Sequence, residues 1–111
     1  MGLLSKKLAA EWVRVASVDD FPTVGDSREV VHNGKEYVIF RLDDGFYCTQ
    51  GSCSHEFSPL SDGLVDGCEV YCEKHGSRFD IKTGAVLSPP ADREIQTFQL
   101  RVEGADILVL V

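Results

Sequence analysis

The chain has 111 residues, four cysteines and a formal charge of −7 at pH 7. This length suits one domain with a modest core and excludes most multidomain enzymes. Acidic residues outnumber basic ones by 18 to 11, so the chain would repel the phosphate backbone of a nucleic acid. We therefore expect no nucleic acid partner.

The N-terminus carries apolar runs of only two or three residues, too short for a secretory signal or a membrane anchor. We expect a cytoplasmic protein without membrane association. In a reducing compartment the four cysteines would bind metal, react or stay as thiols rather than form disulfides. Residues 1–11 are expected to be a helical or frayed extension, and residues 12–111 a single domain.

From residue 12 onward, turn signals recur every eight to twelve residues, which is typical of a small all-β protein of antiparallel strands. The alternation predicts strands at 12–15, 28–31, 35–41 and 46–49. Pro22 follows the first of them and cannot extend a ladder. Asn33-Gly34 favours the two positive φ angles of a tight hairpin between the second and third.

The second half alternates loops with shorter strands. Residues 50–62 and 72–77 have the composition of loops, and they bracket a hairpin of strands 64–65 and 69–71 that turns at Asp66-Gly67. A turn at Lys82-Thr83-Gly84 leads into a strand at 85–87, which Pro89 and Pro90 end. Strands at 95–102 and 107–111 then form a closing hairpin.

Each of the two loops carries one cysteine and one histidine: Cys53 and His55 in the first, Cys72 and His75 in the second. The hairpin between the loops would bring these four side chains together. Two thiolates and two imidazoles fit either a tetrahedral zinc ion or a two-iron cluster with cysteines on one iron and histidines on the other. Zinc fingers of this composition usually pair cysteine with cysteine, so the mixed order favours the cluster.

The pattern C-x-H followed by C-x-x-H resembles the Rieske [2Fe-2S] domain, and the surrounding residues 60–63, 76–80 and 83–84 fit the same family. The resemblance covers residues 12–111. It implies an all-β fold of antiparallel sheets, a sandwich with a cluster-binding subdomain of two loops. Within the family, the chain is most similar to the ferredoxins of bacterial aromatic-ring dioxygenases.

The resemblance also implies a role for each residue. Cys53 and Cys72 would hold the inner iron of one [2Fe-2S] cluster, and His55 and His75 the outer iron. Ser77, Phe79 and Pro89 would surround the cluster. Phe79 stands where high-potential relatives have tyrosine, which places the reduction potential toward the low end of the Rieske range of roughly −150 to +300 mV.

One position departs from the family, since Glu73 replaces the proline that usually follows the second cysteine. This substitution makes the loop more charged. Residues 51–75 hold five acids and one base, and we expect this acidic rim to face basic surfaces on the partners.

By this resemblance the chain is not an enzyme but an electron carrier for aromatic hydrocarbon catabolism. It would pass single electrons from a flavin-dependent NAD(P)H reductase to a terminal ring-hydroxylating oxygenase, as a monomer in transient contact with each. An oxygenase site needs two further histidines and a carboxylate, and His32 is the only histidine left over. Cys48 and Cys68 match no ligand position and are expected to stay thiols.

Two alternatives stay open at this point. The small Rieske-like subunit of an assimilatory nitrite reductase has a similar size and fold. A zinc-stabilised binding module without a redox role is the other.

Overall fold

The computed structural model describes residues 10–53, 59–72 and 76–111. Nearly all its regular structure is β-strand, as predicted, apart from two single-turn 3-10 helices, η1 (Val18–Asp20) and η2 (Leu60–Asp62). The strands of the described residues are β1 (Trp12–Ser17), β2 (Ser27–His32), β3 (Lys35–Leu42), β4 (Gly45–Gln50), β5 (Leu64–Asp66), β6 (Glu69–Tyr71), β7 (Arg78–Asp80), β8 (Val86–Ser88), β9 (Thr97–Phe98), β10 (Leu100–Glu103) and β11 (Asp106–Leu110).

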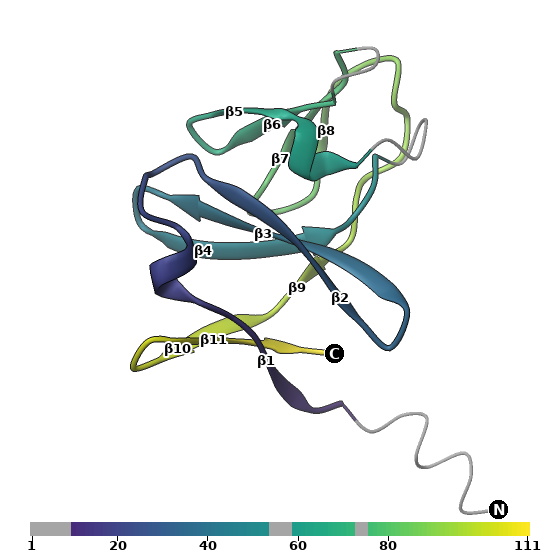
Figure 1. Cartoon of the computed structure of the whole chain (residues 1–111). Coiled ribbons are helices and arrows are strands. Elements are labelled where there is room, and N and C mark those ends of the chain that lie inside the picture. Colours follow the sequence, from purple (N-terminus) through teal and green to yellow (C-terminus); the bar gives the residue numbers. More distant parts are fainter. Residues whose placement is uncertain (1–9, 54–58, 73–75) are drawn as a thin grey trace, which may run out of the picture.

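These strands form three antiparallel sheets, in the orders β1-β11-β10, β2-β3-β4-β9 and β5-β6-β7-β8. The four-stranded sheet of β2, β3, β4 and β9 lies in the middle (Figure 1). The small sheet of β5 to β8 covers one side of it, and β1, β10 and β11 cover the other. We call the β5–β8 sheet and its connecting loops the cluster-binding subdomain, and the other two sheets the base.

Strand β3 is buried on both faces because it lies between the two outer sheets. Val38 and Phe40 point into an upper core shared with the cluster-binding subdomain, while Tyr37 and Ile39 point into a lower core shared with β1 and β11. All four side chains are at most 4% exposed. The run of apolar residues in β3 therefore reflects burial on two sides rather than on one.

The tightest predicted hairpin is confirmed. Asn33 and Gly34 have φ angles of 51° and 78°, and His32 pairs with Lys35 across the turn. Asn tolerates the left-handed region and Gly has no Cβ to clash there, so this dipeptide permits a two-residue connection.

The single strand predicted over residues 95–102 is wrong. Thr97 and Phe98 form β9, which pairs with β4, whereas β10 begins at Leu100 and pairs with β11 in a different sheet. The chain crosses between sheets at Gln99, and the sequence gives no turn residue there. The prediction also missed β7, whose three residues follow the second cysteine loop directly.

The expected N-terminal extension falls mostly on residues 1–9, which lie outside the described residues. Glu11 already pairs with the last residue, since each of Glu11 and Val111 donates its N–H to the other's carbonyl. No helix in the described part of the chain has the length and apolar character needed to cross a membrane.

Gly84 gives a direct test of how the subdomain is tied to the base. Its φ is +82°, and a Cβ at this position would overlap the carbonyl oxygen of Ile95. The two residues are already held together, because the Ile95 N–H donates to the Gly84 carbonyl over 2.9 Å. Gly104 has a similar φ of +63° but open space around it. We expect Gly84→Ala to lower the free energy of unfolding by about 3 kcal/mol or more, and Gly104→Ala by about 1 kcal/mol. Denaturant titration of the two variants measures this difference, and equal losses would contradict the close contact.

Candidate metal centre

The first cysteine loop begins where β4 ends, and its two ends are joined by backbone contacts. Ser52 forms an isolated antiparallel bridge with Pro59, and the Leu60 N–H donates to the Gly51 carbonyl over 2.9 Å. Gly51 lies against Glu36 of β3, where an added Cβ would come within 2.6 Å of the Glu36 Cβ. Cys53 therefore directly follows a bridge that closes the loop, and the base of this loop is fixed against the central sheet.

The second cysteine loop is closed in a similar way at the end of β6. The Cys72 N–H donates to the Ser77 carbonyl over 2.7 Å, and the Gly76 N–H donates to the Cys72 carbonyl over 2.9 Å. Gly76 has a φ of +78°, a conformation that glycine adopts without steric cost. These bonds bring the chain back to β7 within six residues.

Both cysteines lie in the upper core. Cys53 is 0% exposed and Cys72 is 2% exposed, and the two belong to one cluster of buried side chains that also contains Leu60, Phe79 and Ala91. Two loops separated in sequence thus place their thiols in the same apolar region. The predicted partners His55 and His75 lie outside the described residues.

Ser77 connects the second loop to the proline segment. It is fully buried, and its hydroxyl oxygen accepts a hydrogen bond from the Ala91 N–H over 2.9 Å. Among the described residues, nothing accepts the hydrogen of this hydroxyl. A buried O–H donor therefore remains available next to the Cys72 loop, where an unmade hydrogen bond is costly.

The other two predicted neighbours of the cluster differ in burial. Phe79 is fully buried and packs in the upper core. Pro89 is exposed and lies two residues before Ala91, so the Ser77–Ala91 hydrogen bond holds the proline segment close to the second loop.

This donor set fits a sulfur-ligated iron centre. Cysteine thiolates are the usual ligands of iron–sulfur clusters, and hydrogen bonds to the sulfur atoms help to set their potential. Here two buried thiols and one buried hydroxyl donor occur together, with apolar side chains around them. The surroundings would keep water away from the cysteine side of the centre.

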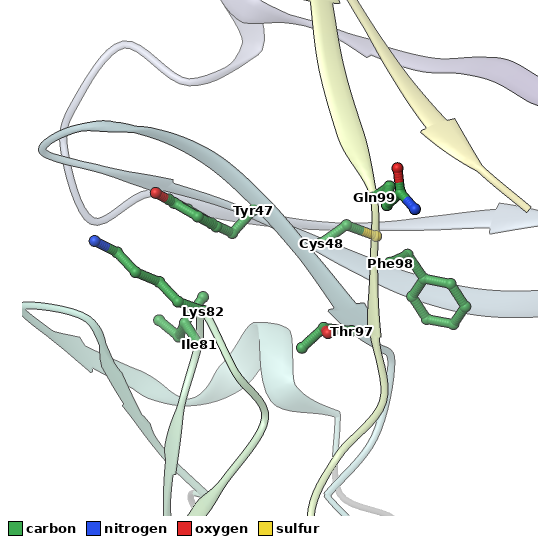
Figure 2. Close-up of a pocket in the computed structure, with 7 residues that line it drawn as sticks. All are labelled: Tyr47, Cys48, Ile81, Lys82, Thr97, Phe98 and Gln99. Carbon is green, nitrogen blue, oxygen red and sulfur yellow. The ribbon is translucent and has the colours of Figure 1, made fainter.

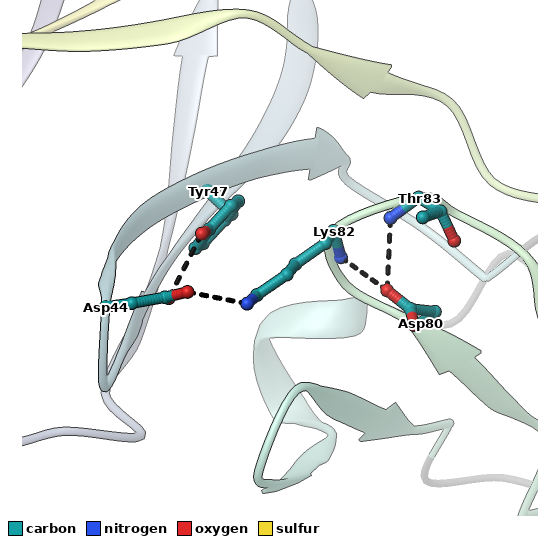
Figure 3. Close-up of polar contacts among 5 residues, drawn as sticks. All are labelled: Asp44, Tyr47, Asp80, Lys82 and Thr83. Atoms are coloured by element: carbon teal, nitrogen blue, oxygen red, sulfur yellow. Dashed lines mark hydrogen bonds and ion pairs between the residues drawn. The ribbon is translucent and has the colours of Figure 1, made fainter.

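A polar network fastens the subdomain to the base (Figure 3). The Lys82 Nζ lies 2.6 Å from Asp44 Oδ2, and the Tyr47 hydroxyl donates to Asp44 Oδ1 over 3.0 Å. Asp80 accepts the backbone N–H groups of Lys82 and Thr83 and so shapes the turn. The hydrogen bond from Lys82 lowers the pKa of Asp44, and the same contact raises the pKa of Lys82.

Sequence reasoning missed this network and the role of Ala91. The Lys82-Thr83-Gly84 segment indicates only a turn, and no local pattern relates Lys82 to Asp44, 38 residues earlier. Ala91 contributes a backbone N–H, and because every residue except proline has one, the residue type gives no sign of this hydrogen bond.

The other two cysteines lie elsewhere. Cys48 borders a hollow of about 260 Å³ between β4, β9 and the Lys82 turn, together with Phe98 and Lys82 (Figure 2). Burial raises the pKa of the Cys48 thiol to about 12, so it stays protonated near neutral pH. Cys68 is exposed in the turn between β5 and β6. Neither belongs to the core cluster that holds Cys53 and Cys72.

Comparison with known proteins identifies the family. The model of the Rieske [2Fe-2S] domain matches residues 11–99. The chain is 36% identical to the biphenyl dioxygenase ferredoxin subunit of Pseudomonas sp. (strain KKS102), over 88% of this chain and 90% of that protein. It is 32% identical to the ferredoxin component of the naphthalene 1,2-dioxygenase/salicylate 5-hydroxylase systems of Ralstonia sp, over 92% of this chain and 97% of that protein.

Solved structures agree with this assignment. The ferredoxin in a complex of reduced oxygenase and oxidized ferredoxin of carbazole 1,9a-dioxygenase superimposes with a TM-score of 0.82 at 30% identity, covering 88% of this chain and 91% of that one. A nitrite reductase small subunit from Mycobacterium tuberculosis superimposes with a TM-score of 0.81 at 21% identity, covering 93% and 96%. At that identity the likeness shows the shared fold alone.

Ser77 should affect both stability and reduction potential. Ser77→Ala leaves the Ala91 N–H without its acceptor, and we expect a loss of about 1–3 kcal/mol in the free energy of unfolding. Losing a hydrogen-bond donor next to the cluster should also lower the potential by about 40 mV, equivalent to about 1 kcal/mol for one electron.

Ser88→Ala is the matched control. The Ser88 hydroxyl also accepts a backbone N–H, that of Arg78 over 3.2 Å, but Ser88 is only partly buried. Protein-film voltammetry should show a shift for Ser77→Ala alone. An unchanged potential in Ser77→Ala would contradict the role of its hydroxyl.

The two remaining cysteines should differ in reactivity. Cys68 is exposed and should react with iodoacetamide in the folded protein, whereas the thiol of Cys48 should stay unmodified at pH 9, because it is buried and has a pKa of about 12. Peptide mass spectrometry locates the modified residue. Modification of Cys48 should appear only after unfolding in urea, and its rapid modification in the folded protein would contradict the burial.

Proposed function

We propose that this chain, which belongs to the Rieske [2Fe-2S] domain family, takes single electrons from an NAD(P)H-dependent flavin reductase and delivers them to a terminal ring-hydroxylating oxygenase. As a ferredoxin component it is an electron carrier and not an enzyme, and its cofactor is one Rieske-type [2Fe-2S] cluster.

The observation that carries the proposal is the position of the two buried cysteines. Cys53 and Cys72 lie in the same core at the start of two closed loops, and each is followed within three residues by a histidine in the sequence. We assign Cys53 and Cys72 as thiolate ligands of the inner iron, and His55 and His75 as ligands of the outer iron. When bound, the cluster supplies one-electron redox chemistry.

The residues around the cysteines support a low potential within the Rieske range. Phe79 offers no hydroxyl to the cluster, and its ring is fully buried. Thr49 and Ser77 are the buried polar side chains of the described residues; the Thr49 hydroxyl donates to the Gln50 carbonyl, whereas the Ser77 hydroxyl accepts from Ala91 and keeps its own hydrogen unused. Fewer hydrogen bonds to the sulfurs stabilise the reduced state less, which suits a carrier that must give its electron onward.

Two further features belong to the same proposal. We place residues 12–111 in one domain with residues 1–11 as an extension, because the first and last strands of the domain, β1 and β11, pair along their length. We also propose that the protein works in the cytoplasm, where NAD(P)H is available, as a monomer that meets its partners transiently.

The ligand assignment is tested by exchanging cysteines. Cys53→Ser and Cys72→Ser should each lose most of the iron and sulfide and the visible absorption of the cluster, because serine is a poor ligand for iron in such clusters. Cys48→Ser and Cys68→Ser are matched controls and should keep the cluster. Iron and acid-labile sulfide analysis after anaerobic purification measures the outcome.

The same preparations test the redox role. Wild-type protein mixed with NADH, a flavin-dependent reductase of a naphthalene or biphenyl system and the matching oxygenase should be reduced and then reoxidised through many cycles. A protein that binds zinc in place of iron and is never reduced would overturn the proposal in favour of a structural zinc module.

A further inference from the structure

Four residues form the row of the small sheet that lies nearest to the cysteine loops. Leu64 pairs with Tyr71, Tyr71 with Arg78, and Arg78 with Ser88. Tyr71 directly precedes Cys72, and Arg78 directly follows Ser77. This row therefore runs across the sheet, from β5 to β8, immediately next to the second cysteine loop and the proline segment.

The row points away from the core. In the next row Val70 and Phe79 are fully buried, and adjacent rows of a sheet face opposite sides. Leu64 accordingly stands in solvent with 69% of its surface exposed, the largest value among the exposed large hydrophobic residues of the described chain. Single exposed apolar side chains are common on protein surfaces. Next to a functional site, however, such a side chain is a candidate contact for a partner.

A second exposed leucine stands at the opposite edge of the same sheet. The register of β8 shifts between its pairs Arg78–Ser88 and Phe79–Val86, so Leu87 is an extra residue in a β-bulge. Bulges redirect side chains, and Leu87 is 40% exposed. The outer strands β5 and β8 are three strand spacings apart, which is about 14 Å. This distance is short enough for one partner surface to contact both leucines.

The charges around Leu64 are acidic. Asp62 and Asp66 are both exposed and lie two residues before and after Leu64, and neither forms an ion pair within the described part of the chain. The one cation in the row, Arg78, is already paired with Glu69 at 2.9 Å and lies over the Tyr71 ring. The surface thus presents an apolar side chain between two carboxylates.

We propose that Leu64 and Leu87 are the apolar anchors with which this ferredoxin docks on the terminal oxygenase, and that the oxygenase surface offers apolar hollows rimmed by lysine or arginine. The inference rests on the proposed function. Two observations support the inference. Both leucines lie beside the loops from which the electron must leave. The carboxylates of Asp62 and Asp66 also favour a partner surface of positive charge.

The proposed contact suits a transient complex. Electron-transfer interfaces are small, below about 1,200 Å² in total, and their affinity depends on a few anchors with near-neutral contacts around them. Two leucines give modest affinity and fast release, while the carboxylates accelerate the encounter and make it sensitive to salt.

The test uses Leu64→Ala and Leu87→Ala with two matched controls, Val31→Ala and Val102→Ala. Val31 and Val102 are also exposed apolar residues, at 62% and 43%, but they lie in β2 and β10 of the base. Oxygenases of the naphthalene, biphenyl and carbazole systems are first screened for electron transfer from the wild-type protein. An accepting oxygenase is then immobilised and Kd measured by surface plasmon resonance.

We expect Kd to rise about five- to tenfold for each leucine variant and less than twofold for each control. All four variants should keep the visible spectrum and the reduction potential of the wild type, which separates docking from cluster assembly. If an accepting oxygenase binds the leucine variants as tightly as the wild type, the inference is wrong while the proposed function stands.

Two other outcomes are also decisive. If no oxygenase accepts electrons from the wild-type protein, the proposed function fails and the inference falls with it. If sedimentation shows a wild-type dimer that Leu64→Ala converts to a monomer, the surface is an interface between two copies of this chain and not a docking site for the oxygenase.

Discussion

The structure depends on one apolar core that is shared between the cluster-binding subdomain and the central strand β3. Cys53 and Cys72 are buried in this core with Val38 and Phe40 of β3. The loops that carry the cysteines are closed by backbone hydrogen bonds at their bases, so the positions of both thiols are fixed by the packing of the sheets below. A ligand site built in this way is preorganised, because the backbone does not need to rearrange to bring the two sulfurs into the same region.

The two parts of the fold, the base and the cluster-binding subdomain, have different roles in this arrangement. The base supplies the covered strand β3 and the residues Asp44 and Tyr47, and Lys82 of the subdomain forms an ion pair with Asp44. The subdomain carries the buried hydroxyl of Ser77, the exposed leucines and the loops that hold the proposed ligands.

Much of this could be predicted from the sequence. Alternation and turn residues predict the all-β class and most strands. The residues Cys53, His55, Cys72 and His75 predict a metal centre, and the resemblance to the Rieske domain implies that it is a [2Fe-2S] cluster. The crossover at Gln99 could not be predicted, because alternation continues unbroken from β9 into β10 while the pairing strand changes. The Lys82–Asp44 pair and the Ser77–Ala91 hydrogen bond were also hidden, since both join segments that only the tertiary fold brings together. Burial of β3 on two faces explains its unbroken apolar run, which a one-sided strand would not show.

We assign two histidines and two cysteines of this chain to one cluster through which the electron passes. Pulsed EPR of the dithionite-reduced protein, prepared with ¹⁵N-labelled histidine, tests it most directly. We expect a rhombic signal coupled to two histidine nitrogens, and loss of one coupling when either His55 or His75 is replaced by cysteine. A reduced protein whose signal shows no nitrogen coupling, or one without an iron signal that contains zinc, would contradict it.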